Sequence, residues 1–325
     1  MQTPIDHLLT SPEPAIRYQA RLYLLGADPA TEEMHRLQNE IRTSPRVQAL
    51  LSERLLDGTI PHRAYTKWVG AHWVLVMLAE LGYPASDPAL LPLVDQELEM
   101  ILNISEITIA GKNRNCASIT AFALWSLLVL GLADERCEIM VERLLNWQWP
   151  DGGWNCDKRP EVNRSSFMES LTPLRALACY ARQTGDSRAA EAVQRAAEIF
   201  LKRQLFKRMQ DGKVMDKNFV LLHYPCYWHY DILFGLKVMA EAGFISDPRC
   251  EAALNLLETK QLPDGGFPAE KAYYRVTEQR VSGRSLVNWG GTSIRKSNPF
   301  VTLDALRVLT AAGRENQPCA ENLKN

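Results

Sequence analysis

Apolar residues recur along most of the chain at positions i, i+3, i+4 and i+7, the spacing that places them on one face of an α-helix. Runs of β-branched residues with the length of a strand are few. The pattern therefore predicts a mainly α-helical protein. The expected helices cover residues 14–26, 31–43, 45–56, 63–82, 87–103, 116–131, 134–147, 165–183, 186–204, 222–242, 247–259 and 297–313.

A sequence repeat organises these helices. Segments 144–160 and 256–272 both contain the end of a helix, a Pro-Asp-Gly-Gly turn and an aromatic residue, and 50–65 and 200–217 are weaker copies. The Asp residues of the four Asp-Gly pairs are 94, 60 and 53 residues apart, and 101–115 fits the long interval as a degenerate copy. Each copy predicts a helical hairpin whose second helix is the more apolar one.

Closure of these hairpins predicts an all-α fold, a six-hairpin α/α toroid whose inner helices line a central cavity. Residues 14–56 would supply the first hairpin, 50–313 the recognisable repeats and 314–325 a C-terminal tail. We therefore expect residues 1–325 to form a single domain.

Composition and charge narrow the class of protein. Hydrophobic residues make up 46% of the chain and charged residues 23%, which is typical of a globular protein with a full core. Lys and Arg total 37 against 38 Asp and Glu, so the net charge of −1 supplies no field that would hold a nucleic acid. The seven Cys are scattered rather than arranged as a disulfide framework, which favours free thiols in a reducing cytoplasm.

Neither a secretory signal nor a membrane span is expected. Residues 1–18 lack a basic start followed by an apolar stretch. The longest apolar run, 119–133, contains Thr120 and Ser126 and is shorter than the ~20 residues that a span needs. A cytoplasmic protein follows from this pattern, and peripheral contact with a membrane stays open.

The turns QWPDGGW (148–154) and QLPDGGF (261–267) resemble the repeat of the terpenoid cyclase and protein prenyltransferase superfamily, the prenyltransferase and squalene oxidase repeat of squalene cyclase-like proteins. The resemblance covers roughly residues 50–313. It implies a toroid of paired helices around a cavity for long, isoprenoid-like molecules. It also implies an enzyme of the isomerase (cyclase) or prenyl transferase type.

The motifs that carry activity in that superfamily are altered in this chain. Class II triterpene cyclases protonate an alkene with an Asp of a DxDD segment, whereas Asn115 and Cys116 stand at the corresponding place, and an amide cannot deliver a proton. The zinc-binding Cys of prenyltransferase β subunits compares with Cys226, but no His occurs in 296–306, where another of their ligands falls. The resemblance therefore implies an apolar substrate and leaves the reaction open.

Four ionisable residues are candidates for proton transfer. Glu169 lies within an expected inner helix, where an apolar chamber would raise the pKa of its carboxyl, and Asp157 follows the Gly-Gly-Trp turn. His229 and Asp231 belong to the segment HYPCYWHYD (223–231), the expected start of another inner helix. The alternatives are exposure of Glu169 on the outer side of its helix and a helix-dipole contact for Asp231.

The same segment is rich in aromatic residues, whose π faces suit an apolar or cationic ligand; a packed helix start is the alternative. The residues expected to bind substrate are Trp154, Tyr224, Tyr227, Trp228, Tyr230, Trp289 and Arg295. For Trp154 we expect a structural role in the turn before a role in binding. For Arg295 the two alternatives are binding of a diphosphate and a solvated position on the rim. The stretch 268–296 is too long for a routine connection and predicts a functional loop or lid.

No cofactor is required by the sequence, and zinc is the alternative. Cys116, Cys156, His223 and Cys226 all lie at expected inner-helix openings and are of ligand types that zinc prefers, but no CxxC or HExxH motif accompanies them. Two further functions stay open. One is a non-catalytic lipid- or isoprenoid-binding protein on the same toroid, and the other is a carbohydrate-active α/α barrel, which would need paired carboxylates.

Overall fold

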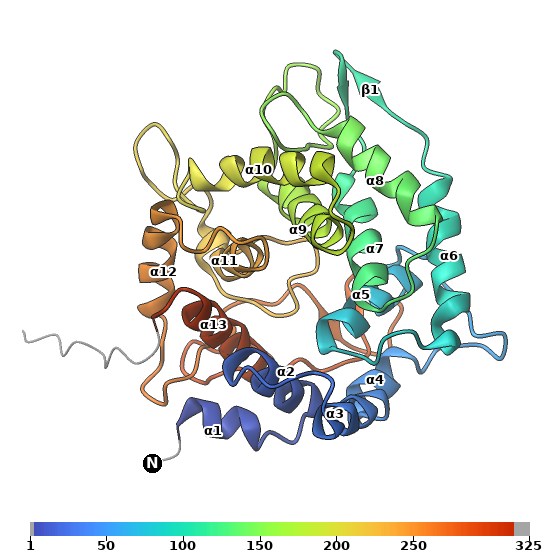
Figure 1. The fold of residues 1–325 in the computed structure, drawn as a ribbon, viewed down its shortest axis with the longest axis vertical. Helices are drawn as coiled ribbons and strands as arrows, with labels where there is room; N and C mark the ends of the chain where they lie inside the picture. Colours follow the sequence, from blue (N-terminus) through green and yellow to red (C-terminus); the bar gives the residue numbers. More distant parts are fainter. Residues whose placement is uncertain (1–2, 315–325) are drawn as a thin grey trace, which may run out of the picture.

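Helices dominate residues 3–314, the part of the chain that the computed structural model describes (Figure 1). The prediction of an all-α fold is confirmed. The α-helices are α1 (Pro4–Leu9), α2 (Pro14–Leu24), α3 (Glu32–Arg42), α4 (Pro45–Leu50), α5 (Ala71–Leu81), α6 (Leu91–Leu102), α7 (Ala117–Val129), α8 (Arg136–Trp147), α9 (Phe167–Thr184), α10 (Ser187–Leu201), α11 (Ile232–Glu241), α12 (Glu251–Glu258) and α13 (Pro299–Ala311).

Short elements occupy some of the connections. They are the 3₁₀ helices η1 (Pro88–Leu90), η2 (Lys217–Val220) and η3 (Pro248–Cys250), and the strands β1 (Thr108–Ile109), β2 (Lys112–Asn113), β3 (Arg275–Val276) and β4 (Arg284–Ser285). Strand β1 pairs antiparallel with β2, and β3 pairs parallel with β4. No helix within residues 3–314 combines the length and the apolar character needed to cross a bilayer.

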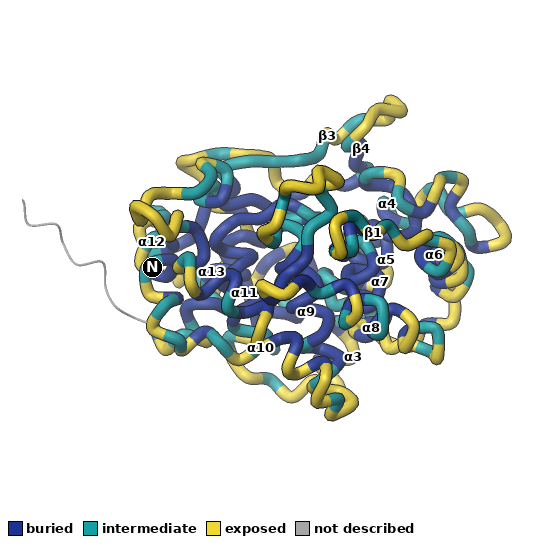
Figure 2. The backbone as a smooth tube through the Cα atoms, turned by 90° about the horizontal axis from the view of Figure 1, so that it is seen from above, coloured by how far each residue is buried: buried dark blue, intermediate teal, exposed yellow. Residues whose placement is uncertain are grey.

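An inner set of helices packs side by side in a ring, in the order α5, α7, α9, α11, α13 and α2 (Figure 1). The side-chain amide of Gln19 in α2 closes the circuit by donating a hydrogen bond of 2.8 Å to the main-chain oxygen of Glu80 in α5. Helices α6, α8, α10, α12 and α3 each pack outside the inner helix that adjoins them in sequence, and α1 packs on α2 and α13. Helices α5 and α7 are buried over nearly their whole surface, as expected for the inner position (Figure 2).

The repeated turns tie each outer helix to the following segment. The side-chain amides of Gln148 and Gln261 donate to the main-chain oxygens of Gly152 and Gly265, at 2.8 and 2.9 Å. Gly152 has φ 102°, a conformation that L side chains rarely adopt. The indole of Trp154 is buried and donates to the main-chain oxygen of Leu144 (2.9 Å). These contacts support a structural role for the two turns and for Trp154.

We call one end of the ring the mouth; it is formed by the segments that precede the inner helices, residues 60–70, 104–116, 149–166, 222–231 and 267–298. The long stretch 268–296 crosses this end (Figure 2). Trp68 fastens it by donating its indole N–H to the main-chain oxygen of Tyr273 (2.8 Å) and its main-chain N–H to that of Arg284 (3.1 Å). Arg284 in turn forms a two-pronged ion pair with Glu53, at 2.9 and 3.2 Å.

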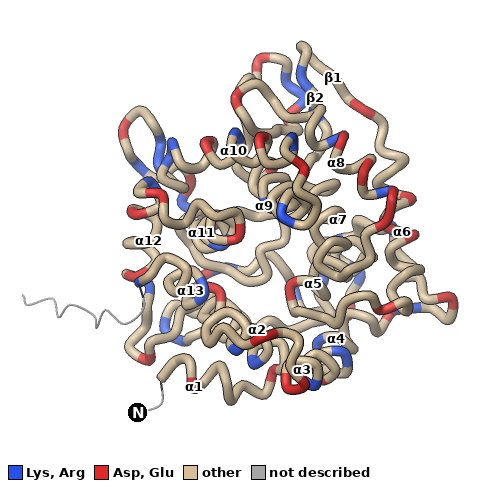
Figure 3. The backbone as a smooth tube through the Cα atoms, viewed as in Figure 1, with Lys and Arg blue, Asp and Glu red and all other residues tan. Residues whose placement is uncertain are grey.

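Charged side chains cross the interior of the ring on the side away from the mouth. Arg175, which is 4% exposed, pairs with Glu80 and Glu241, and Lys237 pairs with Glu80 (3.0 Å) and Asp304 (2.9 Å). Arg307 adds a contact of 3.1 Å to Glu241. We call these six residues, on α5, α9, α11 and α13, the interior ion network (Figure 3). Its positive and negative groups are equal in number.

This network changes the expectation of a wide central cavity. The pocket between Met77, Phe122, Tyr224, Phe234 and Asp304 has a volume of about 10 Å³, room for no more than about one water molecule. At this level of the ring, aromatic and charged side chains occupy the space that a long isoprenoid would need. A larger pocket of about 210 Å³, lined in part by Arg175, Arg307 and Glu241, lies on the far side of the network.

Candidate functional site

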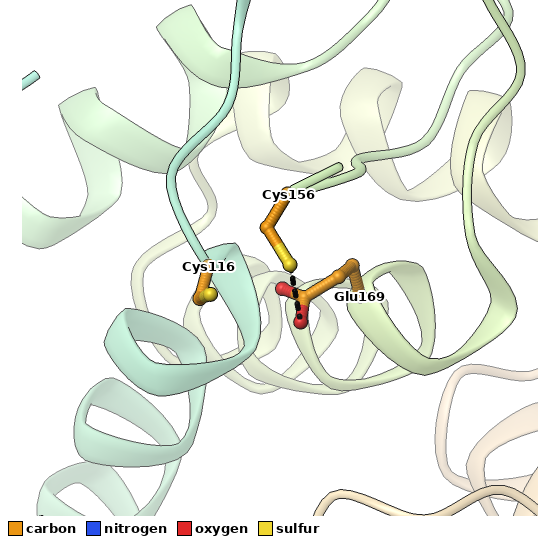
Figure 4. Close-up of side chains that lie close together, drawn as sticks. All are labelled: Cys116, Cys156 and Glu169. Atoms are coloured by element: carbon orange, nitrogen blue, oxygen red, sulfur yellow. Dashed lines mark hydrogen bonds between the residues drawn. The ribbon is translucent and has the colours of Figure 1, made fainter. Parts of the chain in front are cut away.

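Two cysteines and a glutamate converge at the mouth from segments that are distant in sequence (Figure 4). Cys116 is the N-cap residue of α7, Cys156 lies in the segment between α8 and α9, and Glu169 lies in the first turn of α9. Their two sulfur atoms and a carboxylate oxygen all lie within 4.8 Å of one another. The structure thus joins a predicted proton-transfer residue to two predicted zinc ligands; we call this group the mouth cluster.

The carboxylate of Glu169 bridges the starts of two inner helices. It accepts hydrogen bonds from the main-chain N–H and the hydroxyl of Ser118, at 3.0 and 3.1 Å, and from the thiol of Cys156 at 3.5 Å. Ser118 belongs to the first turn of α7, so the carboxylate satisfies one of the N–H groups that a helix start leaves free. Within residues 3–314, Glu169 has no ion pair with Lys, Arg or His.

Burial and mutual contact set the acidity of the cluster. Burial raises the pKa of Glu169, and the two hydrogen bonds from Ser118 oppose that rise. The neighbouring Cys156 lowers the pKa of the Cys116 thiol, whereas Cys116 and burial raise the pKa of Cys156. Cys116 is therefore the thiol that ionises first, and it is also the exposed one.

The donor set suits a thiophilic divalent cation. Zinc is bound in proteins by Cys sulfur and carboxylate oxygen, and catalytic zinc sites have three protein ligands and an open fourth position. Two sulfur atoms and one carboxylate oxygen converge here, with Cys116 facing solvent. The contacts from Ser118 would orient the carboxylate from behind, as outer groups do around metal ligands.

A series of aromatic rings leads from the cluster to the stretch that crosses the mouth. Burial and the nearby Glu169, Cys116 and Cys156 raise the pKa of Tyr65. The Tyr65 ring lies 5.4 Å from that of Trp73, which lies 4.7 Å from Trp68. Trp68 stacks on Tyr227 at 3.8 Å, with the rings 6° from parallel. No sequence pattern singles out Tyr65 as a site residue, because its place beside the cluster depends on how the 60–70 segment crosses the mouth.

His229 does not belong to the mouth cluster. Its imidazole is stacked between Trp228 (3.8 Å) and Tyr273 (3.4 Å), and the ammonium groups of Lys67 and Lys271 lie over the outer faces of those two rings. Burial, helped by His223, lowers the pKa of His229 to about 3. The imidazole is consequently neutral at physiological pH.

The four predicted zinc ligands fall into two separate groups in the described structure. Cys116 and Cys156 join Glu169, whereas His223 and Cys226 lie with Asp231. Asp231 accepts the main-chain N–H groups of His223 (2.9 Å) and Phe234 (2.7 Å), and its Oδ2 lies 2.8 Å from the His223 imidazole. Asp231 thus caps α11, the alternative role foreseen for it, and its oxygens are already occupied.

The remaining predicted site residues are not members of the mouth cluster. Asp157 forms an ion pair with Arg159 (2.7 Å), which lowers its pKa to about 2, so it is ionised at neutral pH and is not a proton donor. The Tyr230 hydroxyl donates to the main-chain oxygen of Leu205 (2.6 Å), and Tyr224 stacks on Phe300 at 4.5 Å. Trp289 is fully buried beside them, whereas Arg295 is exposed.

Comparisons with known proteins give little to build on. No family model and no curated protein sequence matches the chain. One similar solved structure is a type II terpene cyclase from Scytonema, an arginine-to-alanine variant in complex with its substrate geranylgeranyl dihydroxybenzoate. It is 18% identical, the match covers 82% of this chain and 95% of that chain, and the TM-score is 0.27. A likeness at this level carries no argument, so function has to be inferred from the residues themselves.

Proposed function

We propose that the chain is a metal-dependent enzyme on a six-hairpin α/α toroid of the terpenoid-cyclase type, with Zn²⁺ held at the mouth by Cys116, Cys156 and Glu169. The observation that carries the proposal is the convergence of two sulfur atoms and a carboxylate oxygen within 4.8 Å. The ring order of the inner helices, each with an outer neighbour, supports the toroid.

Each residue of the cluster has a distinct part in this proposal. Cys116 supplies the more acidic thiol and the side open to solvent, and Cys156 supplies the second sulfur from the loop. Glu169 supplies an oxygen while Ser118 holds the carboxylate in position. Zinc held by these residues would supply Lewis-acid chemistry, either toward a substrate oxygen or toward a water molecule. Glu169 then acts as a ligand and not as the proton donor suggested by its place in the sequence.

The proposed substrate is a small molecule with an apolar, isoprenoid-like body. Tyr65, Trp73 and Trp68 provide an aromatic path beside the cluster, and such side chains favour apolar groups. Because the pocket beneath Tyr224 holds about 10 Å³, we place the substrate at the mouth and not within the ring at that level.

Zinc titration tests the metal site directly. Protein purified under reducing conditions is stripped with a chelator and titrated with Zn²⁺ against a chromophoric competitor. One equivalent should bind, and C116S, C156S and E169Q should each weaken binding by about 100-fold or more. The matched control is C226S, because Cys226 belongs to the other Cys-containing group at the mouth. Loss of zinc in C226S with retention in C116S would overturn the assignment.

Turnover is tested separately, with squalene and C10–C20 prenyl compounds as substrates. New product that disappears with chelator and returns with Zn²⁺ supports the enzyme. Zinc binding without product from any of them would favour the alternative of a non-catalytic binding protein. Product that resists chelation but is lost in E169Q would return Glu169 to the role of general acid.

A further inference from the structure

A cleft that the proposed metal site does not use lies under the stretch 268–296. It has a volume of about 530 Å³ and is bounded by residues 67–68, 228–229, 272–275 and 281–283. A second cleft of about 370 Å³ adjoins it and shares Lys67, Val281 and Ser282 with it. Together the two clefts are large enough for a small organic molecule.

Aromatic rings make up much of the lining. Trp228, His229 and Tyr273 form a continuous stack, with ring separations of 3.8 and 3.4 Å. Trp68 and Tyr274 complete the aromatic part of the wall, and Ala272 and Val281 add aliphatic surface. Such a wall is suited to the apolar body of a ligand.

The same lining holds polar atoms that the protein leaves without partners. Within residues 3–314, the indole nitrogen of Trp228, Nδ1 of His229 and the hydroxyl of Tyr274 are buried and make no hydrogen bond. His229 is nine-tenths buried, so water does not readily replace the missing partner. Buried polar groups in proteins are nearly always satisfied, so the wall of the cleft holds hydrogen-bonding capacity that the described residues do not use.

Positive charge without a countercharge marks the cleft as a site for an anion. Lys67 lies 4.8 Å from the centre of the Trp228 ring, and across residues 3–314 no carboxylate forms an ion pair with Lys67 or Arg275. By contrast, Arg284 at the edge of the neighbouring cleft is neutralised by Glu53. Indole and tyrosine donors beside an unneutralised ammonium favour an acidic group over a neutral or cationic one.

We propose that this cleft binds an amphiphilic organic anion, with an acidic head group, carboxylate or phosphate, beside Lys67 and an apolar body along the aromatic wall. The binding itself does not depend on the metal. Only the further statement that this anion is the substrate rests on the proposed function, since Trp68 joins the cleft to the rings that lead to Glu169.

Tryptophan fluorescence is the readout, because Trp68 and Trp228 line the cleft. The probes are decanoate, decyl phosphate, decanol and inorganic phosphate, each below its micelle concentration. Saturable binding is expected for one or both decyl anions, at least tenfold tighter than for decanol or inorganic phosphate. Decanoate compared with decyl phosphate shows which head group is preferred.

Two matched lysine variants locate the head group. K67M should weaken binding of the decyl anions by at least tenfold and leave decanol unchanged. K271M is the control, because Lys271 covers the other end of the stack but bonds to Asn218 (2.6 Å) and does not line the cleft. Equal effects of the two variants, or decanol binding as tightly as the anions, would overturn the proposal. C116S should bind the anions like the parent protein, which separates failure here from failure of the metal site.

Discussion

Charged and polar side chains gather at two levels of the same helical ring, and they are satisfied in different ways. In the interior ion network, Arg175, Lys237 and Arg307 are each paired with carboxylates of other inner helices. In the mouth cluster, Glu169 and two thiols meet with hydrogen bonds from Ser118 but with no ion pair within residues 3–314. The charges of the interior ion network balance one another. The two sulfur atoms and the carboxylate of the mouth cluster form no ion pair within residues 3–314 and could bind a ligand.

This difference indicates which group serves the fold and which serves function. A buried charge whose partner is removed costs several kcal/mol, so the network is expected to hold the inner helices in one arrangement. In the mouth cluster the hydrogen bonds from Ser118 hold only the carboxylate, and acidic groups that lie close together disfavour one another's ionisation. The convergence of these three groups beside the exposed Cys116 is better explained by a ligand.

The largest expected effect comes from breaking the network. Arg175→Met leaves Glu80 and Glu241 without their shared cation and should lower the free energy of unfolding by about 3–5 kcal/mol. Urea unfolding measures this change. The control is Arg182→Met, since Arg182 is exposed and donates only to the main-chain oxygen of Glu241. A loss below about 1 kcal/mol in Arg175→Met would contradict a structural role for the network.

Acidification should act on the same groups. Burial alone would raise the pKa of Glu80 and Glu241, but Arg175, together with Lys237 at Glu80 and Arg307 at Glu241, brings both down to about 2 from 4.5. A carboxyl with a lowered folded-state pKa stabilises the protein above its unfolded pKa, and that contribution is lost as the pH falls toward the folded value. Unfolding free energy should therefore decline between about pH 4.5 and 2.

The pH dependence has an internal control. Burial raises the pKa of Asp304, which acts in the opposite direction and reduces the slope. Arg175→Met removes the largest of the causes that lower these pKa values, while Lys237 and Arg307 remain, so its free energy of unfolding should depend less on pH than that of the parent protein. Urea unfolding at several pH values compares the two, and parallel curves would show that Arg175 does not control these carboxyls.

At the mouth, the hydrogen bonds from Trp68 should stabilise the stretch 268–296. Trp68→Phe removes the hydrogen bond to Tyr273 and should cost about 1 kcal/mol. Limited proteolysis should then cut more readily within residues 277–283, which are mostly exposed. Trp228→Phe serves as the comparison, because its indole nitrogen makes no hydrogen bond within residues 3–314. Equal protease resistance of Trp68→Phe and the parent protein would argue against this fastening.

The smallest effect on stability is expected in the mouth cluster itself. Cys156→Ser keeps a donor toward Glu169 and should change the free energy of unfolding of metal-free protein by less than about 1 kcal/mol. With Zn²⁺ present, the parent protein should gain stability and the variant should not, because a ligand raises the free energy of unfolding only of a protein that binds it. Thermal unfolding with and without Zn²⁺ makes the comparison, and an equal gain in both proteins would place the metal elsewhere.

The spacing of apolar residues predicted most of the helices, but it placed the starts of some inner helices too early. Helix α2 starts at Pro14 as expected, whereas α5 and α11 start at Ala71 and Ile232 and not near 63 and 222. The missing turns are the segments that form the mouth. Tyr227, with φ 47°, and the capping side chain of Asp231 show why the second of these segments is not helical. Such a departure depends on tertiary contacts and leaves no periodic signal.

The candidate site was predictable in part. Cys116 and Cys156 could be identified because helix openings of a repeat gather at one end, but the contact with Glu169 depends on the path of residues 149–166. The interior ion network did leave a signal, since Lys237 is the only charged residue in the apolar stretch 232–240 of α11. A lone charge in such a helix implies a buried partner, but which residue pairs with it depends on how the helices pack.

X-ray absorption at the zinc edge tests the central claim most directly, on full-length protein loaded with one equivalent of Zn²⁺. A zinc site at the mouth cluster should give a coordination shell with two sulfur ligands at about 2.3 Å and lighter oxygen or nitrogen ligands at about 2.0–2.2 Å. C116S should reduce the shell to one sulfur. A shell without sulfur, or one unchanged in C116S and C156S, would contradict a metal site at the mouth cluster.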